Sequence, residues 1–246
     1  MHHKKRTKEQ KGELIYGPHA IKEMLLAKKR RLMSIYTTKP LPKAWNRIKQ
    51  YLPKKIPNIQ YVSKDILAKI AGTSDHAGIV ALVSPFKYAT KIFDPKNKPF
   101  ILLLDAVQDV RNLGAILRSA YCTGADGIVI CKKGAASLTP AAFKASAGLA
   151  EYLNIYQAPS INAAVREIKA AGYSLYMAVL EGENALTVKY KKPLCLVIGS
   201  ESIGISKDVQ KEGKLITLPQ KRPDISYNAS VAAGILLFIL SEKVKA

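Results

Sequence analysis

The stretch FILLLDAVQDVRNLGAILRSA (residues 100–120) holds an apolar strand, a polar turn and a helix in direct succession. The helix is predicted because apolar residues recur at the spacing of one helix face, at Leu113, Ile116, Leu117 and Ala120. A strand of uninterrupted apolar residues is typical of a parallel sheet that is covered on both faces. The polar turn lies at the carboxyl end of this strand, where open α/β sheets bind their ligands.

The rest of residues 100–246 repeats this pattern and predicts one α/β domain. Further strands are expected at 126–131, 153–158, 173–180, 194–200 and 214–219, and helices at 113–122, 140–147, 160–171 and 229–241. Strands that alternate with helices in this way form a mostly parallel sheet. The sequence has neither GxGxxG nor GxxxxGK[ST] after the first strand, which speaks against a dinucleotide-binding enzyme.

Residues 12–84 predict a smaller α/β domain. Helices are expected at 19–29, 43–52 and 63–72, and strands at 32–38, 58–62 and 78–83. Ser63 is placed to cap the third of these helices. Residues 85–99 contain three prolines and show no periodicity, which predicts a linker. Residues 1–11 are polar and basic, which predicts a disordered tail.

The formal net charge of +21 is high for a chain of 246 residues, and it is distributed unevenly. Residues 1–100 hold 22 Lys and Arg against 6 Asp and Glu, a net charge of +16, whereas residues 101–246 hold 17 against 12, a net charge of +5. A basic segment of this kind favours a polyanionic partner, most simply a nucleic acid. A basic surface that only confers solubility is the alternative.

Cysteine and histidine are too few and too scattered for a metal site. Cys122, Cys131 and Cys195 form no CxxC pair, which argues against zinc and against a disulfide framework. Free thiols favour a reducing compartment. The basic N-terminus lacks the apolar core of a secretory signal, and the longest apolar run, residues 229–240, is too short to cross a bilayer. We therefore expect a cytoplasmic protein with no membrane segment and no metal.

Polar residues gather at the carboxyl ends of three predicted strands, in QDVRNLGAILRS (108–119), VIGSESIGIS (197–206) and LPQKRPDISYNAS (218–230). Taken singly, Asn112 and Ser226 are each interpreted as a helix cap. Glu201 would cap the following turn, and Arg118 would be an exposed surface charge. Together with Asn228 they indicate one composite site, because ligands bind beyond the carboxyl ends of parallel strands.

These three stretches, in this order, resemble the motifs of the SpoU (TrmH-like) family of RNA ribose 2′-O-methyltransferases, in the SPOUT superfamily. DVRNLGAILRSA (109–120) is similar to motif one, GSESIG (199–204) to motif two, and Pro219 with SYNAS (226–230) to motif three. GPHAIKEML (17–25) and HAGIVALV (76–83) look like the ends of the L30e/L7Ae-like RNA-binding domain of bacterial 23S rRNA guanosine 2′-O-methyltransferases. The resemblance covers the chain from about residue 13 to the C-terminus.

The resemblance implies a fold and a chemistry that periodicity does not show. Residues 100–246 would form a SPOUT α/β-knot domain, which is trefoil-knotted, binds S-adenosylmethionine without a metal and forms a homodimer. Residues 12–84 would bind the RNA substrate, with a guanosine of 23S rRNA as the expected target. The family's catalytic residues carry over to Asn112, Arg118, Glu201, Ser226 and Asn228. Its cofactor contacts, largely made by the backbone, carry over to Gly199, Leu218 and Tyr227.

Such an enzyme moves a methyl group from the cofactor to a ribose 2′-hydroxyl, so the protein must align the reactants and ease the loss of a proton. Arg118 would clamp the phosphate beside the target ribose, or it would accept the proton after losing its charge. Glu201 and Asn112 would orient Arg118, while Ser226 and Asn228 hold the ribose. Two alternatives stay open: a tRNA 2′-O-methyltransferase, and a non-catalytic rRNA-binding factor of ribosome assembly.

Overall fold

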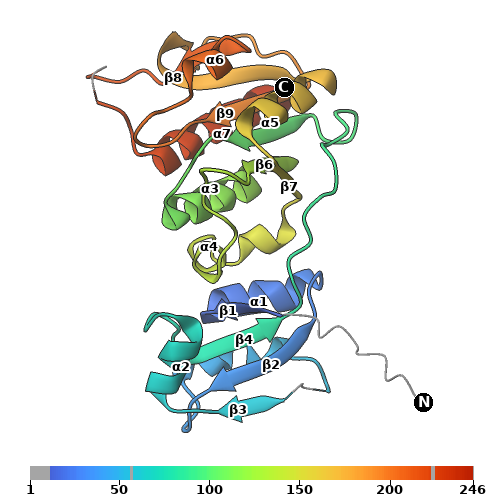
Figure 1. Cartoon of the computed structure of the whole chain (residues 1–246), viewed down its shortest axis with the longest axis vertical. Helices are drawn as coiled ribbons and strands as arrows, with labels where there is room; N and C mark the ends of the chain where they lie inside the picture. Colours follow the sequence, from blue (N-terminus) through green and yellow to red (C-terminus); the bar gives the residue numbers. More distant parts are fainter. Residues whose placement is uncertain (1–11, 56–57, 223–224, 246) are drawn as a thin grey trace, which may run out of the picture. The chain divides into compact units, whose positions relative to one another are not determined.

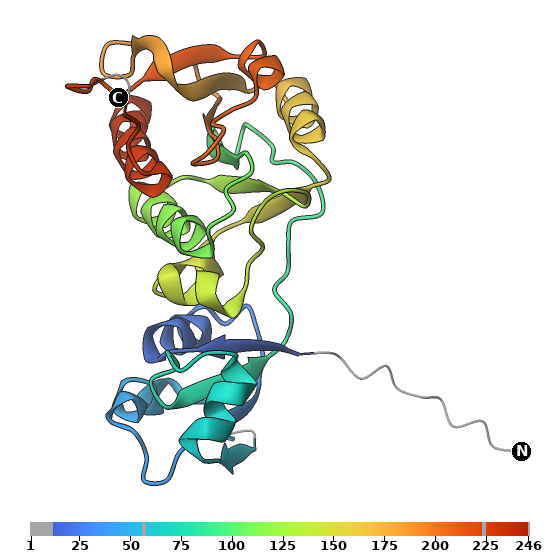
Figure 2. The same ribbon diagram turned by 60° about the vertical axis from the view of Figure 1, so that its left-hand side comes forward.

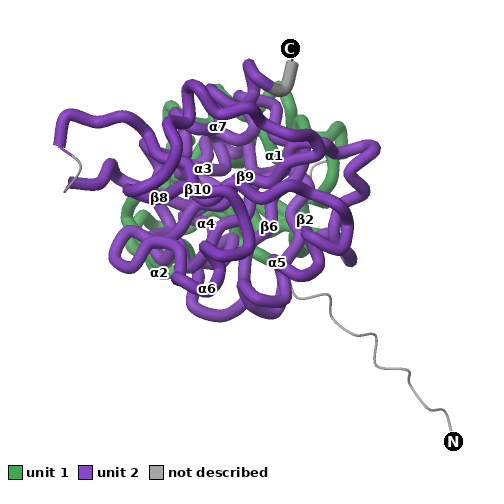
Figure 3. Tube along the Cα trace, turned by 90° about the horizontal axis from the view of Figure 1, so that it is seen from above, with its two compact units in different colours: residues 1–87 green, residues 88–246 purple. Residues whose placement is uncertain are grey.

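The protein is described by a computed structural model that covers residues 12–55, 58–222 and 225–245. The tail expected at residues 1–11 therefore lies outside the described residues. The chain divides into two compact units, residues 1–87 and residues 88–246 (Figure 3). Each unit has its own sheet, drawn in Figure 1.

Unit 1 is built on a four-stranded sheet with the order β1-β4-β2-β3. Its strands are β1 (Glu13–Tyr16), β2 (Leu32–Thr37), β3 (Ile59–Tyr61) and β4 (Ile79–Val83), and its α-helices are α1 (Pro18–Ala27) and α2 (Lys64–Ala71). Ser63 caps α2 as expected, because its hydroxyl accepts the N–H of Ile66 at 3.3 Å. Arg30 is buried and joins the adjacent ends of β1 and β4, donating to Glu13 and to the Ser84 carbonyl at 2.7 Å each.

Two features of unit 1 differ from the prediction. The helix expected at 43–52 is replaced by two short 3-10 helices, η1 (Lys43–Arg47) and η2 (Lys49–Tyr51). They lie between Pro42 and Pro53. Strand β1 was not expected, because ELIY is a short run directly after a polar segment.

Unit 2 is built on a six-stranded sheet with the order β10-β8-β9-β5-β6-β7. The strands are β5 (Phe100–Leu104), β6 (Gly127–Cys131), β7 (Ile155–Ala158), β8 (Ser174–Asn184), β9 (Leu194–Ile198) and β10 (Lys214–Thr217). All five strand pairs run parallel, as the continuous apolar runs predicted.

Helices cover both faces of this sheet. They are α3 (Val110–Thr123), α4 (Pro140–Ala145), α5 (Ile161–Ala170), α6 (Lys207–Gln210) and α7 (Ala229–Lys245), with a 3-10 helix η3 (Leu149–Tyr152). Helix α3 packs against α4 and α7, whereas α5 packs against α6. Figure 2 shows α3 and α7 on one side of the sheet and α5 on the other. Within the described part of the chain, no helix is long and apolar enough to cross a membrane.

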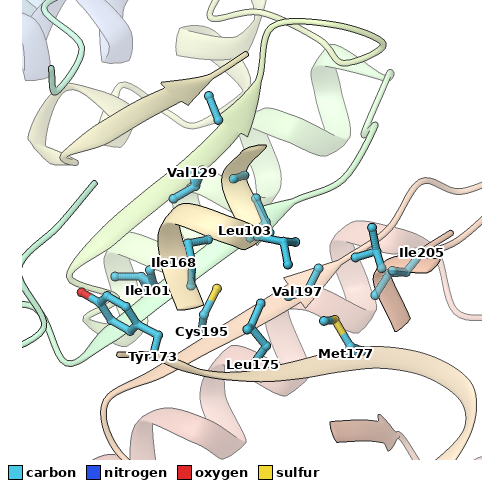
Figure 4. Packing of buried hydrophobic residues seen from close by; sticks show 14 of the residues in the cluster. Ile101, Leu103, Val129, Ile168, Tyr173, Leu175, Met177, Cys195, Val197 and Ile205 are labelled. Carbon is cyan, nitrogen blue, oxygen red and sulfur yellow. The ribbon is translucent and has the colours of Figure 1, made fainter. Parts of the chain in front are cut away.

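The core between the sheet and α5 is formed by apolar side chains from neighbouring strands. Figure 4 shows Leu103 of β5, Val197 of β9 and Met177 of β8 in one cluster with Ile168 of α5. All four are 0% exposed. These buried contacts hold β8, β9 and β5 side by side in the sheet. The loops after β5 and β9 therefore start at the same edge of the sheet.

The segment expected to be a linker is packed on unit 2 from residue 88 onward. The Ala89 N–H donates to the Ile155 carbonyl at 2.8 Å, beside strand β7. Phe93 is 6% exposed and belongs to the same hydrophobic cluster as β5 and α5. It sits over Gly127, where a Cβ would lie 2.5 Å from its ring. The boundary between the compact units thus falls between Lys87 and Tyr88 rather than across residues 85–99.

Candidate functional site

The loop after β9 is a tight turn that two glycines make possible. Ser200 and Gly204 exchange backbone hydrogen bonds of 3.3 and 3.0 Å, and the Ser200 hydroxyl accepts the Ile203 N–H at 3.2 Å. A Cβ at Gly199 would lie 2.2 Å from the Gly204 carbonyl carbon, so no side chain fits there. Gly204 has a φ of +69°, which favours glycine. The Gly-x-Glu-x-x-Gly spacing is therefore a steric requirement of a loop that presents Glu201 outward.

The base of this loop is fixed to strand β5 by Asp105. The main-chain N–H of Asp105 donates to the Ile198 carbonyl at 2.8 Å. Its carboxylate, buried at the strand end, accepts a hydrogen bond from the backbone N–H of Ser206, at the far end of the turn. Burial raises the pKa of Asp105, and the Ser206 hydrogen bond opposes this shift. Asp105 thereby joins the first and last residues of the turn to β5.

Helix α3 brings Asn112 to Glu201. The helix begins at Val110, and its cap is Asp109, whose carboxylate accepts the Arg111 N–H at 2.6 Å. Asn112 consequently lies within the first turn and does not cap the helix, which leaves its side chain available. Its Nδ2 donates to Glu201 Oε1 at 2.5 Å.

Asn228 extends this contact to the third motif. Its Nδ2 donates to Asn112 Oδ1 at 3.3 Å, so Glu201, Asn112 and Asn228 form one hydrogen-bonded chain. Its Oδ1 accepts the N–H groups of Ser230 and Val231 at 2.9 and 3.4 Å, and so Asn228 caps the start of α7. Of the two neighbouring polar residues, Asn228 and not Ser226 makes these capping bonds.

The segments of motif two and motif three, together with strand β8, line a pocket of about 570 Å³ at the carboxyl edge of the sheet. Five of the eight predicted site residues line this pocket: Gly199, Glu201, Leu218, Ser226 and Tyr227. Asn112 and Asn228 do not line it but are bonded to Glu201 directly or through one another. Apolar walls come from Ile198, Ile205, Leu215 and Leu236. A largely apolar cleft of this size with a few polar groups is typical of a small-molecule or cofactor site.

Arg118 stands apart from this pocket. It lies six residues after Asn112 in α3, about 9 Å further along the helix axis. Its side chain is exposed and does not line the pocket. Within residues 12–55, 58–222 and 225–245 it has no hydrogen-bond or ion-pair partner. The structure thus brings seven of the eight predicted residues together and leaves the eighth on an open surface.

Strand β8 contributes a pocket wall that was not expected from the sequence. β10 pairs with β8 at residues 176–177 and again at 183–184, so the segment between them bulges out of the ladder. Ala178, Val179, Leu180 and Glu181 of this bulge line the pocket. The one signal for it is the acidic end of LEGEN (180–184), where two glutamates interrupt an otherwise apolar strand.

The described residues contain no cluster of three or more His, Cys, Asp or Glu side chains that could hold a metal ion. The pocket therefore offers apolar surface, backbone groups and single polar side chains as its means of binding. These groups suit an organic ligand that combines an apolar part with hydrogen-bonding groups.

Comparison with known proteins identifies the family. The model of the SpoU rRNA methylase family matches residues 99–238, and a model described as RNA 2′-O ribose methyltransferase substrate binding matches residues 14–89. A Bacillus subtilis protein, YacO, named as a TrmH family tRNA/rRNA methyltransferase, is 33% identical and covers 95% of this chain and 97% of its own. The 23S rRNA (guanosine-2′-O-)-methyltransferase RlmB of Acinetobacter baylyi is 29% identical over 93% of this chain and 96% of its own.

The fold is shared with solved structures. AviRb from Streptomyces viridochromogenes, a SpoU methyltransferase solved in complex with AdoMet, aligns with a TM-score of 0.78, 20% identity, and coverage of 96% of this chain and 91% of that one. This likeness confirms the α/β fold with a parallel sheet and a preceding substrate-binding domain. The resemblance seen in the three motifs is likewise confirmed. The chain belongs to the SpoU rRNA methylase family of RNA 2′-O-methyltransferases.

Proposed function

We propose that this protein transfers a methyl group from S-adenosylmethionine to a ribose 2′-hydroxyl, and that its target is a guanosine of 23S rRNA. The observation that carries the proposal is the pocket formed by motif two and motif three, with Glu201 held at its edge by Asn112. The choice of RNA follows relatives such as the Acinetobacter baylyi enzyme, which is named for 23S rRNA and for guanosine. We also propose that the protein acts in the cytoplasm, where such a substrate is found.

The pocket fits the cofactor in size and in the character of its walls. Leu218 directly follows β10, and Tyr227 lies two residues before α7. Both line the cavity. Gly199 leaves the backbone of the motif-two loop open, because any side chain there would strike Gly204. Backbone groups of these three positions would hold the cofactor, which supplies the electrophilic methyl group when bound. We also propose that the domain of residues 100–246 contains the trefoil knot of the family.

The polar residues would position the ribose. Glu201 is fixed by Asn112, and Asn112 by Asn228, so the carboxylate is held in place before substrate arrives. Ser226 lines the pocket and would hold the ribose edge beside it. Arg118 would bind the phosphate next to the target nucleotide, because the planar guanidinium donates two parallel hydrogen bonds to phosphate oxygens.

A homodimer would explain why Arg118 lies outside the pocket of its own chain. Val231, Ile235 and Phe238 recur at helical spacing on α7 and are 48%, 38% and 62% exposed. An exposed apolar stripe of this kind is typical of a protein interface. Helix α7 packs on α3, where Gly234 approaches Ser119, the neighbour of Arg118. We propose that two copies pair through this stripe and that Arg118 of each copy serves the pocket of the other.

Unit 1 would bind the RNA. Residues 1–87 hold 19 Lys and Arg against 5 Asp and Glu, a net charge of +14. Two lysines lie beside aromatic rings on this unit: Lys39 is 4.7 Å from the Tyr61 ring centroid, and Lys22 is 5.5 Å from that of Tyr51. Lysine and arginine side chains raise the affinity for RNA by contacting its phosphates, and exposed aromatic rings can stack on unpaired bases.

Transfer of a radioactive methyl group tests the proposal. The purified protein is incubated with methyl-tritiated S-adenosylmethionine and, separately, with 23S rRNA and total tRNA that lack the modification. We expect label in 23S rRNA. Label in tRNA alone would support the tRNA enzyme instead. Absence of label from both RNAs, with the cofactor bound, would support the non-catalytic assembly factor.

A further inference from the structure

The charge of the pocket is opposite to the charge of the chain. The protein carries 39 Lys and Arg residues, yet none of them, and no His, is among the described residues that line the pocket. The charged residues that do line it are two carboxylates, Glu181 and Glu201. A cavity with this lining favours a ligand that carries positive charge.

The two carboxylates differ in what they contact. Glu201 accepts the hydrogen bond from Asn112 and is part of the chain that ends at Asn228. Glu181 has no hydrogen-bond or ion-pair partner among the residues that the structure describes. Glu183, two residues further along β8, does not line the pocket and is paired with Lys214 at 2.9 Å. Glu181 is therefore the carboxylate that stays available to a ligand.

The bulge of β8 holds Glu181 at the pocket wall. The Thr217 hydroxyl donates to the Leu180 carbonyl at 2.8 Å and ties the bulge to β10. On the other side of Glu181, Gly182 lies so close to β10 that a Cβ would be 2.8 Å from the Leu215 carbonyl carbon and the Ile216 nitrogen. The residues before and after Glu181 are thus both anchored on β10, which limits where its side chain can reach.

We propose that Glu181 is a specificity-determining residue that recognises the positive charge of the cofactor and so distinguishes the sulfonium substrate from its thioether product. This inference rests on the proposed function. During transfer, the methyl carbon leaves sulfur for the ribose 2′ oxygen, the electron pair of the broken bond stays on sulfur, and the hydroxyl proton passes to water. The cofactor thereby loses one positive charge, while its ammonium and carboxylate groups are unchanged. A nearby carboxylate attracts the charged form and loses that attraction when the product forms.

The consequence is a binding preference that helps turnover. Glu181 strengthens the binding of S-adenosylmethionine and leaves that of S-adenosylhomocysteine almost unaffected, so product is displaced by fresh cofactor. Because Glu181 is exposed, the attraction is partly screened by solvent and weakens with salt.

Isothermal titration of both ligands, without RNA, tests the inference on the full chain. Glu181→Gln removes the charge and keeps the shape. We expect it to lower the affinity for S-adenosylmethionine by about two- to fivefold, the range of an exposed ion pair. The affinity for S-adenosylhomocysteine should stay within about 1.5-fold of the wild-type value. Glu181→Asp, which keeps the charge, should retain more of the preference. Glu183→Gln is the matched control and should change neither affinity.

The outcomes separate this inference from the proposed function. If Glu181→Gln lowers the affinity for both ligands equally, or for neither, the role of Glu181 is overturned while the methyltransferase proposal stands. If the wild-type protein binds neither ligand, the proposed function itself fails. A circular dichroism melt of each variant shows whether lost binding reflects lost folding, and Glu181→Asp then serves as the folded comparison. Loss of the preference for S-adenosylmethionine at high salt in the wild type supports the charge effect; a salt-independent preference contradicts it.

Discussion

Asn112 connects three segments that are remote in the sequence. It lies 89 residues from Glu201 and 116 residues from Asn228, and it bonds to both. A side-chain amide suits this position because it donates through nitrogen and accepts through oxygen. An aspartate there could accept from Asn228 but could not donate to Glu201. The type of residue is therefore dictated by its two partners.

Asn228 has two functions that one substitution can separate. Asn228→Asp keeps the oxygen that caps α7 but loses the Nδ2 donor to Asn112. We expect the free energy of unfolding to change by less than about 0.5 kcal/mol, while methyl transfer falls about tenfold, as for one lost hydrogen bond. Asn228→Ala, by contrast, should also cost about 1 kcal/mol of stability. Urea titration and tritium transfer measure the two effects, and full activity of Asn228→Asp would refute the positioning role.

Arg118 tests the catalytic assignment at a single side chain. Arg118→Ala should keep the fold and bind S-adenosylmethionine normally, because Arg118 does not line the described pocket of its own chain. We expect its methyl transfer to fall about a hundredfold or more, as when a charge-stabilising donor is removed from an active site. Arg118→Lys should fail as well, because an ammonium cannot form the bidentate contact.

The control for this prediction is Arg166→Ala, which removes an exposed arginine from α5 without touching the proposed site. Its activity should match that of the wild type. If Arg118→Ala turns over at a rate near that of Arg166→Ala, Arg118 has no part in the reaction.

For single residues, the sequence predicted which polar side chains lie close together better than how they bond to one another. The motifs named all eight site residues, and seven of them are joined in or around one pocket. The hydrogen bond from Asn112 to Glu201 could not be predicted, because it depends on how α3 is placed against the loop after β9. Glu181 was missed because its strand bulges, and a bulge depends on pairing with β10 rather than on local sequence.

Helix α3 is the element that holds the site together, since it packs against both α4 and α7. Gly114 permits the close approach to α4: a Cβ there would lie 2.4 Å from the Ala145 Cβ and 2.8 Å from the Ala142 carbonyl oxygen. The glycine of motif one therefore serves the packing of the helix that carries Asn112.

Gly114→Ala should destabilise the protein by about 1–3 kcal/mol through overpacking. Gly234→Ala is the matched control, because its Cβ would meet nothing nearer than the Ser119 hydroxyl at 3.4 Å. In a helix interior this substitution should be neutral or stabilise by up to about 1 kcal/mol. Thermal melts of both variants check the contrast, and equal melting temperatures would show that α3 and α4 can separate without cost.

Cys131 at the end of β6 should make the free energy of unfolding depend on pH in the alkaline range. Burial, and to a lesser extent the nearby Asp105 carboxylate, raises the pKa of Cys131 from 9.0 to about 11. The folded state therefore keeps a proton that the unfolded state releases. Its contribution to stability is complete below pH 9 and is lost as the pH rises toward 11.

Urea unfolding between pH 8.5 and 10.5 measures this linkage. The wild type should lose up to about 1 kcal/mol per pH unit more than Cys131→Ala above pH 9. Cys122→Ala, which removes an exposed thiol, should follow the wild-type slope. Identical slopes in all three proteins would mean that the Cys131 pKa is not raised by folding.

Element types in unit 2 were predicted well because buried parallel strands read as continuous apolar runs. Their ends were predicted less well. The helix of motif one begins at Val110 rather than near Leu113, since Asp109 supplies the cap. The four-residue helix α6 was not expected, because a single turn leaves no periodic signal. In unit 1 the helix expected at 43–52 is two short 3-10 helices instead.

At the scale of the whole molecule, charge is divided between the two units. Residues 1–87 carry a net charge of +14 and residues 88–246 a net charge of +7, with 20 Lys and Arg against 13 Asp and Glu in the latter. The carboxylate-lined pocket lies in the less basic unit. RNA affinity and cofactor affinity should therefore be separable.

Removal of residues 1–87 tests this division. The cut preserves Phe93 and Ala89, which pack on unit 2. The remaining unit should bind S-adenosylmethionine with unchanged affinity but lose about tenfold or more in affinity for rRNA, and its RNA binding should depend less steeply on salt. Filter binding at several salt concentrations measures this, with titration of the cofactor as the control. Unchanged rRNA methylation by the shortened chain would show that unit 1 is dispensable for the substrate.

The central claim is that the pocket of unit 2 methylates a ribose 2′-hydroxyl in 23S rRNA. The most direct measurement is nucleotide-resolution mapping of 2′-O-methylation, by resistance to alkaline cleavage, in unmodified 23S rRNA treated with the protein and S-adenosylmethionine. We expect one new resistant position, at a guanosine, that is absent with Arg118→Ala. No resistant position, or a methyl group that leaves every ribose open to alkaline cleavage, would contradict it.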